Sequence, residues 1–133
     1  MSVTCVELGS GERHRAPVSG GPIAEILLGK EPGRQMGVVE VTVPACGLMP
    51  LHEHGTSETL LIPLHGAVRL ISGGDDGELT MLEPGTLVVI PVGEKVRLEN
   101  PEGEAGKLLV VFSPVEFTER IAAWPREMVP VAA

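Results

Sequence analysis

Short runs of aliphatic residues, separated by glycine, proline and charged residues, recur along the whole chain. Runs rich in valine, leucine and isoleucine that are bounded by such residues are typical of β-strands. The pattern predicts strands over residues 2–8, 22–29, 36–43, 58–64, 67–72, 78–82, 86–91, 95–100 and 106–113. Between the fifth and sixth of these runs, GGDDGE predicts a hairpin turn, because glycine and aspartate tolerate positive φ.

This spacing of roughly ten short strands indicates an all-β sandwich or barrel rather than a parallel α/β sheet. Only residues 115–124 have a helical pattern, and Pro125 is expected to end that helix. The chain contains no evident internal linker or repeat. We therefore interpret residues 1–133 as a single domain.

The net charge of the chain argues against two classes of binding partner. With a net charge of −8 and no basic cluster, it is a poor partner for nucleic acid or for an anionic membrane surface. No apolar stretch reaches the roughly 18 residues of a membrane span. The first residues lack the features of a signal peptide, so we expect a cytoplasmic protein. Cys5 and Cys46 are expected to be free thiols, with Cys46 buried.

The stretch LHEHGTSET at residues 51–59 holds the candidate chemistry. In an extended segment His52 and His54 point to the same side, and Glu58 follows at the start of the next run. If Glu58 faces inward, it shares its face with Leu60, Ile62 and Leu64; the other register turns in Thr59, Leu61, Pro63 and His65. The interior of a barrel favours the first register, because its charged end then faces the histidines and an aliphatic run lies below it. On these residues alone, a metal site and a polar strand entrance both remain open.

A wider stretch, GLMPLHEHGTSETLLIPLHG at 47–66, resembles the first conserved motif of the cupin superfamily. GTLVVIPVGEKVRLEN at 85–100 is similar to the second cupin motif, with its glycines, proline and Asn100 in place. The resemblance covers about residues 36–113. It implies an antiparallel jelly-roll β-barrel, here with a short C-terminal helix. It also implies a divalent metal, Fe, Mn, Ni or Zn, held by His52, His54 and Glu58.

Two departures from the cupin pattern affect this ligand set. Val96 stands where the second motif supplies a histidine ligand, so the metal can be absent. Seven residues rather than six separate Glu58 from Gly66, and counting back from Gly66 puts Thr59 at the ligand position. A β-bulge at Pro63 would absorb the extra residue, and we therefore expect Glu58 to face the site.

The remaining polar residues are expected to lie outside the candidate site. His65 is predicted to be exposed, and His14 is predicted to lie in a polar N-terminal loop. Arg69 is predicted to lie on the surface or in an ion pair, and Glu99 to mark the end of a strand.

Three functional hypotheses follow. The first is a metal-dependent enzyme, of dioxygenase or isomerase type, acting on a small organic molecule. The second is a non-catalytic module that binds a small apolar ligand. The third is a small homodimeric protein with a vestigial pocket, joined through exposed apolar residues of the first run or near Trp124. No acid–base pair or activated nucleophile accompanies the candidate ligands, so whether the chain is an enzyme is left undecided.

Overall fold

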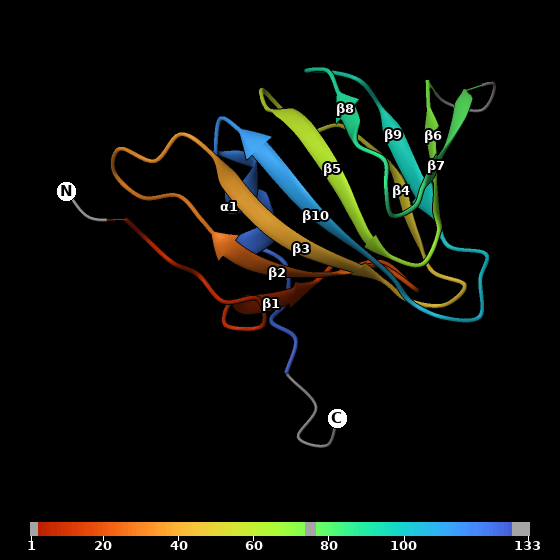
Figure 1. The fold of residues 1–133 in the computed structure, drawn as a ribbon, viewed down its shortest axis with the longest axis horizontal. Coiled ribbons are helices and arrows are strands. Elements are labelled where there is room, and N and C mark those ends of the chain that lie inside the picture. Colours follow the sequence, from red (N-terminus) through yellow and green to blue (C-terminus); the bar gives the residue numbers. More distant parts are fainter. Residues whose placement is uncertain (1–2, 74–76, 129–133) are drawn as a thin grey trace.

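The computed structural model describes residues 3–73 and 77–128 of the chain. These residues form ten strands and one short helix (Figure 1). In chain order they are β1 (Glu12–Arg15), β2 (Ile23–Leu28), β3 (Gly37–Val43), β4 (Leu48–His52), β5 (Glu58–His65), β6 (Val68–Ser72), β7 (Glu78–Leu82), β8 (Val88–Ile90), β9 (Val96–Glu99), β10 (Gly106–Ser113) and α1 (Phe117–Ala122). The prediction of an all-β domain with a short C-terminal helix is confirmed.

The strands form two antiparallel sheets that pack face to face. The larger sheet has the order β1-β2-β3-β10-β5-β8, and the smaller has the order β4-β9-β6-β7. Strands from opposite ends of the sequence are paired in the larger sheet, where β10 lies between β3 and β5 (Figure 1). This arrangement confirms the predicted antiparallel jelly-roll fold, although no ladder joins the two sheets among the described residues, so they are not closed into a barrel.

The interior between the sheets is largely aliphatic because inward apolar residues alternate with outward residues along much of the longer strands. In β10, Leu108, Val110 and Phe112 are buried while the residues between them point outward. Inward residues of both sheets join them in one cluster, which includes Val39, Leu61, Leu70 and Val96. Each fully buried side chain of this size contributes about 1.5–3 kcal/mol of hydrophobic stabilisation.

The N-terminal region departs from the prediction. Residues 3–10 form no strand, and the first strand is β1, which was not predicted. Its His14 is 1% exposed, with Nδ1 2.8 Å from the Trp124 carbonyl oxygen and Nε2 2.8 Å from Glu12. The expectation that His14 lies in a polar loop is therefore wrong, because it is a buried residue of β1. The side chain ties β1 to the segment that follows α1.

Helix α1 has only six residues, fewer than the predicted ten, and none of the described helices is long and apolar enough to span a bilayer. Thr118 and Ile121 are its buried residues. The helix packs closely against Gly37 at the start of β3, where a Cβ atom would overlap Thr118 Cγ2. This contact fixes α1 over one end of the space between the sheets.

Asn100, one of the residues in the second motif, has a structural role. It is 2% exposed, and its Nδ2 lies 3.1, 3.1 and 2.9 Å from the carbonyl oxygens of Val43, Pro44 and Glu104. Its Oδ1 accepts a hydrogen bond of 3.0 Å from the Glu102 amide. The side chain thereby satisfies buried backbone groups of two adjacent loops.

Candidate ligand and metal site

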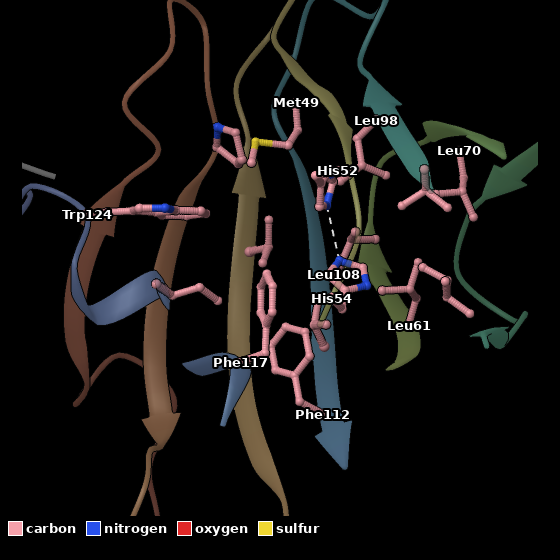
Figure 2. A pocket seen from close by; sticks show the side chains of 16 residues that line it. Met49, His52, His54, Leu61, Leu70, Leu98, Leu108, Phe112, Phe117 and Trp124 are labelled. Atoms are coloured by element: carbon pink, nitrogen blue, oxygen red, sulfur yellow. Dashed lines mark hydrogen bonds between the residues drawn. The ribbon is translucent and has the colours of Figure 1, made fainter. Parts of the chain in front are cut away.

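The two histidines of the HEH stretch meet between the sheets, as the sequence predicted. His52 ends β4, and His54 lies in the loop that leads to β5. Their Nε2 atoms are 3.1 Å apart (Figure 2). His54 is 8% exposed and has edge contacts with Phe117 and Phe112, with ring centroids 4.9 and 5.6 Å away. Aromatic rings thus pack against one side of the histidine pair.

The hydrogen bonds of the pair define the protonated nitrogens of the neutral rings. His52 Nδ1 lies 2.8 Å from the Pro50 carbonyl oxygen, which only accepts, so Nδ1 carries the proton. His52 Nε2 is then an acceptor, and His54 Nε2 donates to it. This leaves His54 Nδ1 to accept from the Thr59 hydroxyl at 3.1 Å. A single directional chain therefore runs from Thr59 through both imidazoles to the backbone.

Both rings are kept neutral by their surroundings. Burial lowers the pKa of His52 below its usual value, against a smaller opposing effect of the Pro50 carbonyl. Burial also lowers the pKa of His54, to about 4, and the charge of Arg120, together with that of His52 whenever His52 is protonated, adds to the effect. Neutral imidazoles can donate one hydrogen bond, accept another, or bind a metal ion.

The imidazole pair borders a cavity of about 60 Å³ between the sheets. Apart from the histidines, its walls are aliphatic, aromatic or thioether groups (Figure 2). The lining residues are Pro22, Val41, Met49, His52, His54, Leu61, Leu70, Ile90, Val96, Leu98, Leu108, Val110, Phe112, Phe117, Ile121 and Trp124.

The structure does not bring Glu58 to the histidines. Glu58 lies on the exposed face of β5, and Thr59 is fully buried beside His54. The predicted bulge exists next to Pro63, because Leu108 pairs with Pro63 while Lys107 pairs with His65. It shifts only the end of β5 after Pro63, and the residues before it keep Thr59 inward. The expected register of Glu58 is therefore wrong.

The donor atoms at the site form an incomplete metal-binding set. Two imidazole nitrogens bound to one cation at about 2.1 Å and at right angles would lie roughly 3.0 Å apart, close to the observed Nε2 separation. However, Val96 fills the position of the fourth ligand with a buried side chain. Within the described residues, no group of three or more His, Cys, Asp or Glu is placed to hold a metal. The protein alone thus offers two ligands, which do not fit a tightly held resident metal.

The other predicted polar residues lie away from the cavity. His65 is exposed, with Nε2 3.8 Å from Glu104, and Arg69 is exposed on β6, as expected. Cys46 is exposed, so the expectation of a buried thiol is wrong. Its backbone has a positive φ of 59°. Neither it nor Cys5 forms a disulfide in the structure. Glu99 lies at the end of β9 and pairs with Arg97 at 3.2 Å.

Sequence reasoning missed the aromatic wall of the site. Phe117 and Trp124 both line the cavity, although they belong to the helical segment that was assigned no role in the site. Phe112 of β10 completes the wall, with its ring centroid 5.0 Å from that of Phe117. The chain has only three aromatic residues of the Phe, Trp and Tyr types, and all three border this cavity. The scarcity of aromatic residues in the sequence could have drawn attention to these three, but it does not indicate where in the fold they lie.

Comparisons with known proteins support the fold and do not extend to function. No protein-family model matches the sequence, and no curated protein matches it. The structure is similar to that of the polyketide cyclase RemF from Streptomyces resistomycificus, with 22% identity, coverage of 84% of this chain and 80% of that chain, and a TM-score of 0.71.

Two further solved structures resemble this chain. An RmlC-like cupin with a double-stranded β-helix fold from Methanocaldococcus jannaschii has 20% identity, coverage of 81% of this chain and 94% of that chain, and a TM-score of 0.61. The iron(II) form of HppE has 12% identity, coverage of 83% and 60%, and a TM-score of 0.70. Together with the two facing antiparallel sheets, these similarities show that the chain has the cupin fold.

Proposed function

We propose that this protein binds a small, largely apolar organic molecule between its sheets, with the polar group of that molecule at His52 and His54. The observation that carries the proposal is the composition of the cavity wall. It is apolar except for two imidazoles that converge at one place. Such a combination of an apolar enclosure and a few convergent polar groups is typical of small-molecule sites.

The imidazole pair limits the polar group that fits. Each ring is neutral and already has a hydrogen-bond partner at both nitrogens. A hydroxyl or carbonyl group can replace the bond between the rings, because it can accept from His54 Nε2, and a hydroxyl can also donate to His52 Nε2. A charged ammonium group would lose its hydration without gaining a carboxylate partner. We therefore favour an uncharged alcohol, phenol or carbonyl compound.

A second candidate function is a metal-dependent enzyme. The Nε2 separation of 3.1 Å favours it, since two ligands in neighbouring positions around one cation have nearly this spacing. RemF is named as a cyclase and HppE contains iron(II), so enzymes and a metal occur among the structural neighbours. Because the protein supplies only His52 and His54, further donor atoms would have to come from the bound molecule or from water. A bound metal would supply Lewis-acid or, as iron, redox chemistry.

Two measurements on the untagged protein test these proposals. The first records side-chain NMR signals of the histidines while isobutanol or phenol is added. We expect saturable shifts of His52 and His54, with dissociation constants on the order of millimolar for such small probes. His65→Ala, which removes an exposed imidazole, should leave the binding unchanged. Absence of saturable shifts with either probe would overturn the binding proposal.

The second measurement is metal content by elemental mass spectrometry, before and after incubation with Fe²⁺, Mn²⁺, Ni²⁺ and Zn²⁺. Near-stoichiometric metal in the wild type that is lost in a His52→Ala/His54→Ala double variant would support the second candidate. Equal, negligible metal in both proteins would refute it. The His65→Ala variant again serves as the control, because a metal lost there would indicate binding at the surface.

A further inference from the structure

The two imidazoles at the cavity differ in which nitrogen carries the proton. His52 Nε2 is an unprotonated acceptor, because the proton of this ring is on Nδ1 and points to the Pro50 carbonyl oxygen. His54 Nε2 then carries the proton of the hydrogen bond between the rings, and its Nδ1 accepts from the Thr59 hydroxyl. The two Nε2 atoms are 3.1 Å apart at the cavity (Figure 2). The imidazoles themselves therefore form the acid–base pair that the sequence did not reveal.

A carbonyl compound presents the groups that complement this pair. Its oxygen accepts a hydrogen bond, and the carbon next to the carbonyl group bears a weakly acidic proton close to that oxygen. If the oxygen accepts from His54 Nε2, the adjacent C–H bond can face His52 Nε2. A neutral imidazole can polarise a carbonyl group, and imidazole is also the most frequent general base in enzymes.

We propose that His52 and His54 catalyse the enolisation of a carbonyl compound, with His52 as the general base and His54 as the hydrogen-bond donor to the oxygen. This activity rests on the small-molecule binding proposed above. His52 Nε2 removes the proton, the electron pair of the C–H bond forms a C=C bond, and the carbonyl π electrons move onto the oxygen. The imidazolium of His52 then returns the proton, either to the oxygen, which gives the enol, or to carbon, which gives the ketone. The reaction needs no oxidant, reductant or second reactant.

The surroundings of the pair favour this proton transfer. Among the described residues, none of those that line the cavity is charged, so the enolate and the imidazolium would attract each other strongly. Arg120 lies close enough for its positive charge to act on His54, and its Cζ is 5.3 Å from the centre of the Phe117 ring. The same charge favours negative charge that develops on an oxygen bound at His54.

The strength of the base defines the class of substrate. Imidazole, with an ordinary histidine pKa of about 6.5, is a weak base toward a C–H bond. His54 stabilises the oxygen with a single hydrogen bond. A second electron-withdrawing group must therefore acidify the same C–H bond, and a second carbonyl group does so without adding charge. The class that fits both the pair and the apolar wall is a 1,3-dicarbonyl compound with a short apolar frame.

The test follows the exchange of a carbon-bound proton for deuterium in D₂O by proton NMR, with the untagged protein. The probe is 3-methylpentane-2,4-dione, which has one proton on the carbon between its carbonyl groups. We expect the protein to accelerate this exchange about 10²-fold or more over free imidazole at the same concentration. The histidine signals in the same samples report whether the diketone binds. His65→Gln, which replaces an exposed imidazole, should exchange at the wild-type rate.

Two glutamine variants separate the roles of the imidazoles. His52→Gln should abolish the acceleration, because an amide cannot take up the proton. His54→Gln should retain part of it, because an amide N–H can still donate to the carbonyl oxygen. Saturable shifts of the remaining histidine verify that each variant is folded and binds the diketone. A larger loss in His54→Gln than in His52→Gln, or no loss in either, overturns the proposal.

Thr59 is a positioning residue in this scheme, because its hydroxyl holds His54 in the tautomer that donates from Nε2. Thr59→Val should lower the exchange rate while the diketone still binds, and Thr59→Ser should restore the rate. An exchange rate in Thr59→Val equal to that of the wild type would contradict this role.

The outcomes distinguish this proposal from the binding proposal and from metal catalysis. Saturable shifts of His52 and His54 without accelerated exchange overturn the enolisation and leave the binding site intact. Absence of both shifts and acceleration overturns both proposals. Acceleration that is lost with EDTA and returns with Zn²⁺ also overturns the enolisation by the histidine pair, because a metal ion would then polarise the carbonyl group. Acceleration that persists in EDTA and is lost in His52→Gln supports it.

Discussion

Acidification should destabilise the protein through His54, and the effect can be worked out from the structure. The folded protein lowers the pKa of this imidazole to about 4, chiefly by burial, whereas the unfolded chain has the ordinary value of 6.5. Below about pH 6.5 the unfolded state therefore binds the proton and the folded state does not. Stability is full above this pH and falls as the pH decreases toward 4.

The size of the effect follows from the two pKa values. A difference of about 2.5 between 6.5 and 4 corresponds to about 3 kcal/mol once both states are protonated. At about pH 5 the folded form is still neutral and the unfolded form is charged, so the loss is about 2 kcal/mol. His52 adds to it in the same direction, because its pKa is also lowered. This is a large part of a typical stability of about 5–15 kcal/mol.

The assay is urea unfolding across the range from about pH 8 to pH 5, for the wild type and for His54→Gln. Carboxylates also titrate at the acidic end, so the difference between the two proteins isolates His54. We expect the wild type to lose about 2 kcal/mol more than the variant by pH 5. His65→Gln controls for the loss of an imidazole at an exposed site on β5. Parallel stability curves for wild type and His54→Gln would refute the reasoning.

Three substitutions test the packing around the site by urea unfolding at neutral pH. Thr59→Val removes the hydroxyl that His54 accepts from and should cost about 1–3 kcal/mol, whereas a cost near zero would contradict the proposed chain of hydrogen bonds. Asn100→Asp replaces the donor group facing three carbonyl oxygens and should cost about 3 kcal/mol or more; an unchanged midpoint would show that water can take over this role. Gly37→Ala should cost about 1–3 kcal/mol because its methyl group overlaps Thr118, while Gly103→Ala, with open space around it, should be neutral.

The strand pattern could be predicted because it depends on local alternation. Most predicted runs agree with observed strands to within two residues, and β10 agrees at both ends. The failures have tertiary causes. The residues at 3–8 pair with no strand, whereas β1, with sequence ERHR, forms a strand by pairing with β2. Its His14 contacts the segment that follows α1, through the Trp124 carbonyl oxygen and a β-bridge with Arg126.

The face of β5 could not be predicted from spacing alone. A shift of one residue in register exchanges the two faces of a strand, so Glu58 and Thr59 compete for one inward position. The bulge beside Pro63 was anticipated correctly, but its effect depends on which part of the strand is anchored. The pairing of Thr59 with Ile90 and Phe112 anchors the part before the bulge. Leu61 and Thr59 are then inward, and Glu58 is exposed.

This register also determines what the histidine pair can bind. Thr59 donates to His54 Nδ1, and this places the proton on Nε2, directed toward His52. A metal at the pair needs both Nε2 lone pairs, so His54 must move its proton to Nδ1 and donate to the Thr59 oxygen instead. Because both rings are already neutral, this exchange requires no net loss of a proton. It sacrifices one hydrogen bond, worth about 1 kcal/mol. The hydroxyl at Thr59 therefore permits both states, and an aliphatic side chain there would support neither.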